Sequence, residues 1–246
     1  MRTCTDRCKN DNNGFSLVEL IVAIAVGSIV AGAIASLIVI TTRMYSKEST
    51  NIAGQYEIQT TLNQTVDSAE SAQWFALSEE KSGGKTVNTK YVAFGKLTGT
   101  APNMKFEGEI FTDDYNAASP GRFNVYMNRY NSASPLVVGS EADAGAAIAT
   151  EVSGIKGKKY LLGEGATKYV VSLDTGANRF TDDPSLEAAG YAGYYENPII
   201  FTVSIDFAKD SMTGEIKKHV EDKVTFRNRI NRSLYIDGKG YYKLKE

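Results

Sequence analysis

The sequence predicts an α+β protein in which one long N-terminal helix packs with its outer half against an antiparallel β-sheet. An apolar run over residues 15–42 exceeds the roughly 20 residues that a helix needs to cross a bilayer. Beyond this run the chain turns polar, yet apolar residues recur at helical spacing and no proline precedes Pro102. From about residue 85, β-branched and aromatic segments alternate with turn residues, as is typical of antiparallel sheet.

We expect the helix to run without a break from Phe15 to about Leu77, and the segment Ser82-Gly83-Gly84 to end it. At 1.5 Å per residue it would be about 95 Å long, so its outer half must pack on other elements to be stable. Gly27 and Gly32 are its weak points inside the apolar run.

Seven later segments have the composition of strands: 89–97, 105–112, 122–130, 168–173, 199–207, 223–230 and 233–236. In the fifth of these, apolar residues occupy every second position, as expected for a strand with one buried face. Residues 210–214 predict a turn. Residues 141–150 fit either a short helix or a loop, and residues 186–190 fit a helical turn.

Glu19 is the one charged residue inside the apolar run. A carboxylate at bilayer depth costs on the order of 2.5–3.5 kcal/mol, so it marks a partner or a function. A secretory signal peptide is one alternative, because Ala33-Ile34-Ala35 would provide a cleavage site before Ser36. The apolar run is long for such a peptide and continues past that site. A plain membrane anchor explains the length but leaves Glu19 unexplained.

The segment over residues 9–20, KNDNNGFSLVEL, closely resembles the class III leader junction of type IV prepilins and type II secretion pseudopilins. The resemblance implies that a prepilin peptidase cuts between Gly14 and Phe15 and that Phe15 is then N-methylated. Glu19 is the fifth residue of the mature chain, the position of a carboxylate that acts in assembly in this family. Many pilins bend this helix at a proline, which the chain lacks here.

The resemblance also implies a pilin fold divided into a leader (1–14), a transmembrane half-helix (15–42), an amphipathic half-helix (43–80) and a globular β-rich head (81–246). The expected function is a structural subunit, a minor pilin of a type IV pilus. Residues 223–228, KVTFRN, resemble the late strand of larger minor pilins and J-type or W-type pseudopilins. A pseudopilin of a type II secretion or competence DNA-uptake system, a major pilin, and a soluble protein released after Ala35 are the alternatives.

The expected partners are other pilin subunits, the prepilin peptidase, the membrane assembly platform and the cytoplasmic membrane, with the cell-surface pilus as the final location. The formal net charge of −2 provides no basic signal for nucleic acid. We expect no enzyme, cofactor or metal. Both cysteines, Cys4 and Cys8, lie in the expected leader, and the single histidine, His219, lies in a lysine-rich segment. The acidic pairs 113–114 and 182–183, with Asp174, match no calcium-loop pattern.

Overall fold

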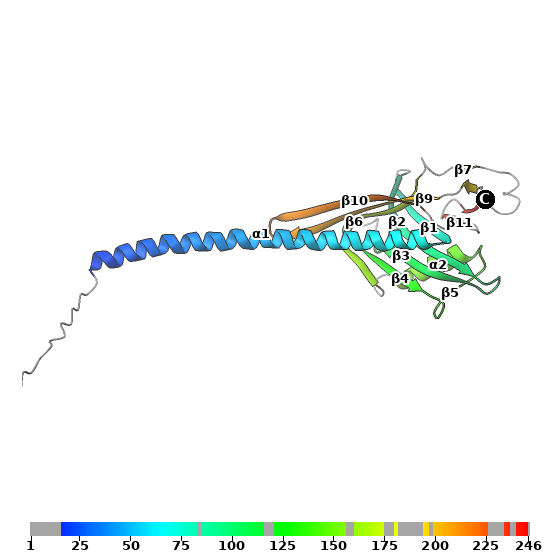
Figure 1. Ribbon diagram of the computed structural model, residues 1–246, viewed down its shortest axis with the longest axis horizontal. Helices are drawn as coiled ribbons and strands as arrows, with labels where there is room; N and C mark the ends of the chain where they lie inside the picture. The colour runs from blue at the N-terminus through cyan, green and yellow to red at the C-terminus, as the bar shows by residue number, and fades with distance from the viewer. Residues whose placement is uncertain are drawn as a thin grey trace, which may run out of the picture.

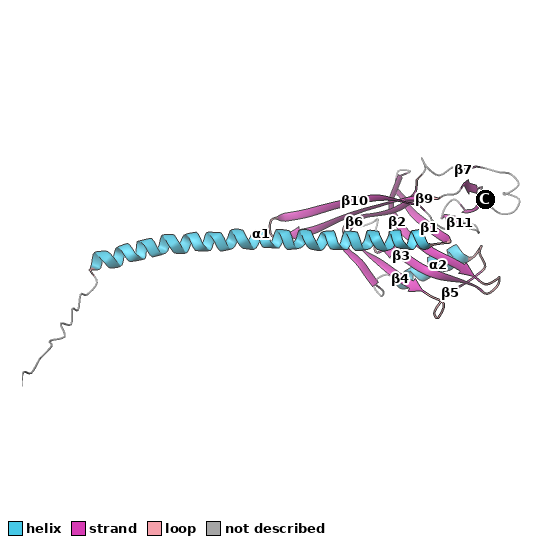
Figure 2. Ribbon diagram, in the orientation of Figure 1, coloured by secondary structure: helices cyan, strands magenta, loops and turns pink. Residues whose placement is uncertain are grey.

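The computed structural model describes residues 16–82, 85–115, 121–155, 160–174, 180–181, 194–196, 199–225, 234–236 and 240–245. A single long helix, α1 (Leu17–Ser71), projects from a β-rich head and packs on it with its outer half (Figures 1 and 2). The predicted α+β, pilin-like arrangement is therefore confirmed.

Helix α1 ends at Ser71, so the prediction that it continues to about Leu77 was wrong. Ala72 has extended backbone angles, φ −71° and ψ 152°, and the next segment is strand β1 (Trp74–Ser82). Trp74 belongs to one core cluster and Phe75 to the other, so successive side chains of β1 point to opposite faces of the sheet. An uninterrupted apolar run fits a strand buried on both faces as well as it fits a helix, and here tertiary packing decides.

The remaining elements are as follows: β2 (Lys85–Thr98), β3 (Met104–Asp113), β4 (Phe123–Tyr130), β5 (Leu136–Gly139), α2 (Ala144–Ile155), β6 (Tyr160–Leu173), β7 (Phe180–Thr181), β8 (Tyr194–Glu196), β9 (Ile200–Ser211), β10 (Gly214–Thr225), β11 (Leu234–Ile236) and β12 (Gly240–Lys245). The described strands form one sheet in the order β10-β9-β6-β4-β3-β2-β1-β11-β12-β8-β7, and β5 pairs with β3. Most pairs are antiparallel, but β1–β11 and β12–β8 are parallel.

Most predicted strands fall on observed ones. The segments 89–97, 105–112 and 122–130 correspond to β2, β3 and β4, and 199–207 lies largely in β9. The segment 168–173 is only the second half of β6, and β10 begins well before the predicted 223. Residues 226–230 and 186–190 lie outside the described residues. The ambiguous 141–150 segment forms helix from Ala144.

The core has two parts, one on each face of the sheet. The first contains Ile58 and Leu62 of α1 with the aromatic side chains of β9, and the second contains Ile148 and Val152 of α2 with Phe106 of β3. Helix α1 therefore covers one face of the sheet and the short helix α2 covers part of the other (Figure 2).

The sheet curls so that β2 also meets β6, although β3 and β4 lie between them in the strand order. The Thr89 hydroxyl donates to the Val171 carbonyl (3.1 Å) and accepts from the Val171 N–H (2.7 Å). The Asn88 side-chain oxygen accepts from the Tyr169 N–H (3.1 Å). These buried side chains supply the bonds that a neighbouring strand would otherwise make. The contact between β2 and β6 therefore encloses the first part of the core at this edge.

Strands β9 and β10 form a long hairpin, here called the arm (200–225), which lies beside α1 and points toward the N-terminal end of the helix (Figure 1). Its strands join through a two-residue turn, Met212-Thr213, and Gly214 takes a φ of 123° that favours glycine. The turn predicted at residues 210–214 is confirmed. Among the described elements of the head, the arm reaches furthest along α1 toward the apolar segment (Figure 1), and its Met212 meets Ser46 there.

Candidate functional site

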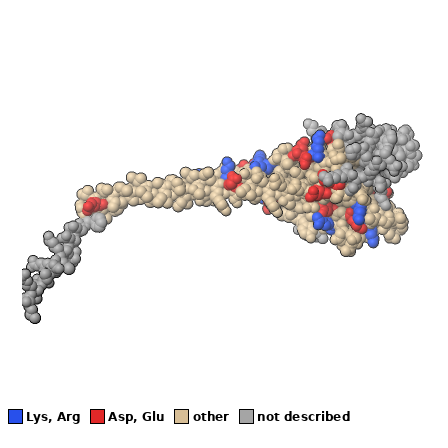
Figure 3. Space-filling model, in the orientation of Figure 1, with Lys and Arg blue, Asp and Glu red and all other residues tan. Residues whose placement is uncertain are grey.

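The N-terminal half of α1, residues 17–42, is an exposed apolar segment, here called the rod. No charged residue occurs between Glu19 and Arg43, and none of the span's most apolar window is buried in the chain. Figure 3 shows this stretch free of charged side chains between one acidic patch near its start and the charges next to the head. Within the described residues, α1 is the one helix long and apolar enough to cross a membrane.

Polar groups in this rod are satisfied internally. Each hydroxyl side chain donates to a main-chain carbonyl three or four residues earlier: Ser28 to Ala25, Ser36 to Gly32, Thr41 to Leu37 and Thr42 to Ile38, at 2.8–2.9 Å. Such bonds let hydroxyl groups enter hydrocarbon without an unpaired donor. The helix also continues unbroken through Gly27 and Gly32, the two weak points named from the sequence.

Glu19 stands at the start of α1 and caps it. The Ser16 N–H donates to Glu19 Oε2 (3.0 Å), and the Val18 N–H donates to the Ser16 hydroxyl (3.3 Å). This capping box satisfies main-chain donors that the first helical turn leaves open, and it places the carboxylate at the positive end of the helix dipole. From the sequence, Glu19 was interpreted only as a charge that marks a partner or a function, although the S-x-x-E spacing of residues 16–19 also predicts this cap. Gly14 and Phe15 lie outside the described residues.

A cluster of four charged side chains joins the arm to the rest of the head. Arg122 donates to both carboxylate oxygens of Asp210 (2.7 Å each) and to Glu215 (2.9 Å), whose other oxygen pairs with Lys217. The hydrogen bonds from Arg122 lower the pKa of Asp210 and of Glu215 below their ordinary values, and they raise the pKa of Arg122. Both carboxylates therefore stay ionised and paired at neutral pH.

Glu57 of α1 is the main polar link between the helix and the arm. Its Oε1 pairs with Lys209 Nζ of β9 (2.5 Å), and its Oε2 accepts from the Glu164 N–H of β6 (3.0 Å). Both charged side chains are only about one-fifth exposed. Glu57 thus holds the amphipathic half of α1 against two strands at once, and nothing in the sequence pattern singled it out.

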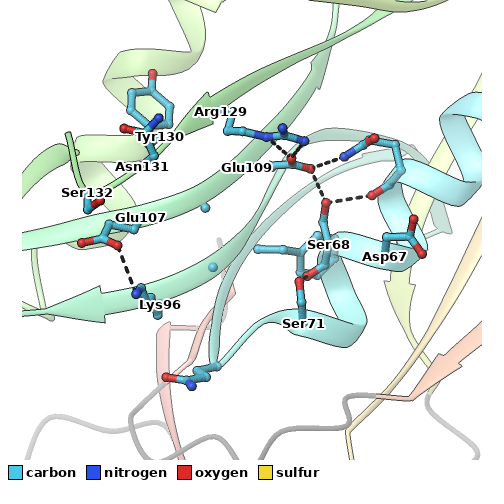
Figure 4. Close-up of a pocket in the computed structure, with 15 residues that line it drawn as sticks. Asp67, Ser68, Ser71, Lys96, Glu107, Glu109, Arg129, Tyr130, Asn131 and Ser132 are labelled. Carbon is cyan, nitrogen blue, oxygen red and sulfur yellow. Dashed lines mark hydrogen bonds and ion pairs between the residues drawn. The ribbon is translucent and has the colours of Figure 1, made fainter. Parts of the chain in front are cut away.

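A polar groove of about 680 Å³ lies between the last turns of α1 and the strands β2, β3 and β4 (Figure 4). At its centre the nearly buried Glu109 accepts from Gln64 Nε2 (2.7 Å), from the Ser68 hydroxyl and from Arg129 Nε (2.6 Å). These donors saturate the carboxylate, so Glu109 ties the end of the helix to the sheet. Nothing in the sequence pattern indicated this cluster.

The residues considered for chemistry in the head are spread among structural contacts. His219 Nδ1 contacts Asp206 Oδ1 on the neighbouring strand, with the ring more than half exposed. Asp113 accepts from the Asn88 side chain, and Asp174 pairs with Lys223 (2.6 Å). Throughout the described part of the chain, no group of three or more His, Cys, Asp or Glu is placed to hold a metal ion. Residues 182–183 lie outside it.

Residues 9–35 match the prokaryotic N-terminal methylation motif. No curated protein and no solved structure matches the chain. The matched segment covers the leader junction, Glu19 and most of the apolar rod. Together with the long helix packed on a β-sheet, it supports a type IV pilin-like prepilin, a structural class of protein that assembles with other pilin subunits and is processed by a prepilin peptidase.

Proposed function

We propose that this chain is a minor pilin, a non-enzymatic structural subunit of a type IV pilus. It enters the cytoplasmic membrane as a prepilin, loses residues 1–14 and is N-methylated on Phe15. The membrane assembly platform of the pilus then adds it to a filament at the cell surface. The observation that carries the proposal is the methylation motif at the start of a helix whose apolar half is not buried by the described part of the chain. We expect residues 15–42 to form the membrane-spanning half, the remainder of α1 to Ser71 the amphipathic segment, and the chain from β1 onward the head, so the predicted boundary at residue 80 moves back to the end of α1.

The exposed rod explains how one segment serves two environments. Its side chains are half to three-quarters exposed, for example Val39 at 49% and Leu17 at 74%. Lipid tails and neighbouring apolar helices are about equally apolar, so moving the rod from bilayer to filament does not transfer it into water. The change of partner then depends on close packing and on the few polar groups at the helix start.

Cleavage between Gly14 and Phe15 is the first testable step. Mass spectrometry of the mature N-terminus should find methylated Phe15. Gly14→Val should block processing, because the added side chain prevents close approach of the peptidase to the backbone. A mature chain that begins at Ser36 would show instead that the segment is a secretory signal peptide.

We propose that Glu19 pairs with the positive amine of Phe15 in a neighbouring subunit. The capping box supplies a matched control, because glutamine at the third helical position still accepts the Ser16 N–H but carries no charge. Glu19→Gln and Glu19→Val should both reduce incorporation into filaments, measured as the sheared surface fraction against total membrane protein. Wild-type incorporation of Glu19→Gln with failure of Glu19→Val would assign the residue to helix capping alone.

The same motif and rod fit a pseudopilin of a type II secretion or DNA-uptake machine. The shearing experiment separates the two functions. A minor pilin should appear in sheared filaments together with a more abundant subunit, whereas a pseudopilin should stay with the cell envelope.

A further inference from the structure

The arm brings its tip, residues 211–214, to the part of α1 that follows the apolar rod. The Met212 N–H donates to the Ser46 hydroxyl (3.4 Å), and the Met212 side chain is 69% exposed. Figure 1 shows β9 and β10 lying beside α1 and extending from the head toward the rod. Since Lys209 meets Glu57 and Met212 meets Ser46, the arm descends along the helix toward its N-terminus.

The length of the rod places this tip relative to a bilayer. From Leu20 to Ile40 the helix rises about 31 Å, which matches a hydrocarbon core of about 30 Å. Ser46 lies about 9 Å further along the axis, and each headgroup layer is about 5–8 Å thick. A tilt of about 20° lowers this height slightly. The arm tip is therefore at the outer boundary of the headgroups, within reach of the exposed Met212 side chain.

The chemistry around the tip suits a lipid surface. Met44 and Tyr45 of α1 are 67% and 74% exposed. Tyrosine is enriched at membrane interfaces, where its ring lies at the level of the headgroups, and Met44 adds an exposed apolar side chain beside it. Exposed Arg43 and Lys47 flank them and, together with exposed Glu48 next to Lys47, give this part of α1 a net charge of about +1 that attracts anionic headgroups. The arm carboxylates nearest the tip are already paired with Arg122, so they present little repulsion to those headgroups.

The arm is also fixed to α1 by the fold, so its tip can limit how deeply the helix inserts into the membrane. Its two strands pair in continuous register from Gly214↔Ser211 to Thr225↔Ile200. Glu57 fixes β9 to α1 at the ion pair with Lys209, and the Phe207 ring packs in the core beneath. The distance between the tip and the rod is therefore set by the fold.

We propose that the arm tip contacts the lipid headgroups of the membrane in which α1 is inserted and thereby sets the depth and tilt of the subunit before assembly. The proposal rests on membrane insertion of α1, which belongs to the proposed function. Lipid is favoured over a second copy of the chain because the tip lies at the outer boundary of the headgroup layer and because residues 43–48 of the neighbouring helix turns carry a net positive charge.

The test uses the full chain in which Cys4 and Cys8 are replaced by serine. Single cysteines are then introduced one at a time, and each is labelled with an environment-sensitive nitrobenzoxadiazole probe. Met212→Cys reports the tip. Ser36→Cys reports the rod, and Thr100→Cys reports the exposed β2–β3 turn near the far end of α1. Each protein is reconstituted into phosphatidylcholine vesicles with a minor fraction of phosphatidylglycerol, carrying spin labels either on the headgroup or deep in the acyl chain.

The probe at 212 should lose fluorescence with headgroup labels and little with deep labels, whereas the probe at 36 should respond to deep labels and the probe at 100 to neither. If 212 behaves like 100 while 36 is quenched, the tip proposal is wrong and insertion stands. If 36 is not quenched by deep labels, insertion and the tip proposal both fail. Shielding at 212 that follows the protein-to-lipid ratio and not the spin label would identify a second copy, against the proposal.

Discussion

Replacing Glu57 with alanine is expected to loosen the helix from the head. The substitution removes the ion pair with Lys209 (2.5 Å) and the hydrogen bond from the Glu164 N–H (3.0 Å) together. It leaves an ammonium and a main-chain donor without their acceptor at the packed surface between α1, β6 and β9. The rest of the core, including Ile58 on the next position of the helix, is untouched.

The magnitude follows from the exposure of the pair. Exposed ion pairs contribute about 0.2–1 kcal/mol, whereas breaking a fully buried one costs about 3–5 kcal/mol. Glu57 and Lys209 are about one-fifth exposed, so Lys209 regains part of its hydration when its partner is lost. We therefore expect a loss of about 2 kcal/mol, which for a protein of this size lowers Tm by about 4–8 °C.

The assay is thermal and denaturant unfolding of the full chain in detergent micelles, followed by the fluorescence of Trp74. This is the single tryptophan of the chain and is only 1% exposed, so its emission reports unfolding of the head. Lys217→Ala is the matched control, because Lys217 is 76% exposed and its partner Glu215 (3.1 Å) keeps its ion pair with Arg122. The control should change stability by less than about 1 kcal/mol. A Glu57→Ala protein within about 0.5 kcal/mol of wild type would refute the assignment of Glu57 as the link between helix and arm.

Three further predictions concern the head. A chain that begins at Arg43 should be soluble and melt cooperatively, and circular dichroism without sheet or without a transition would contradict the division into rod and head. Because Arg122 lowers the pKa of Asp210 below 3.8 and of Glu215 below 4.5, their pairing stabilises the fold above these values and is lost as pH falls through the lowered ones. The Tm of wild type should therefore fall more steeply below about pH 4.5 than that of Arg122→Gln, whereas parallel curves would contradict this. Gly163→Val should cost about 1–3 kcal/mol in denaturant unfolding, because the new side chain would enter the space of a β9 ring and of α1, and an unchanged midpoint would show that the strand can shift.

Periodicity alone predicted the main division of the molecule. The helical spacing beyond the apolar run indicated the outer half of α1, and the alternation in residues 199–207 indicated β9, because both patterns follow from which side chains are buried. The apolar run indicated the inner half of α1 by its length and composition, since its side chains are exposed in the chain itself. The same reasoning failed for β1, since Trp74 to Leu77 are apolar at every position and carry no period. It failed for most of β10 because the outer face of this edge strand is charged, with Lys217 and His219 exposed.

The candidate site divides in the same way. Glu19 was found from the sequence because a charge inside an apolar run is unusual, and its capping partner Ser16 was readable from the S-x-x-E spacing. Glu57 and Glu109 were not readable. Glu57 meets groups 107 and 152 residues away in the chain, and Glu109 meets Gln64 from a different element. Such contacts depend on how helix and strands are placed in space, and a charged residue on an amphipathic helix gives no sign of them.

The long separation along the chain between Glu57 and its partners bears on how the protein reaches its folded state. Helix α1 is synthesised first, but the strands that cover Ile58 and Leu62 are completed only when residue 209 and those after it have emerged. Contacts of such high sequence separation form slowly, because a large loop must close before they stabilise anything. Until then the face of α1 that carries Ile58 and Leu62 is exposed and can associate with other apolar surfaces. The helix is therefore synthesised first, but its apolar face is buried last. A chain truncated before β9 would leave this face exposed permanently and be a substrate for proteolysis.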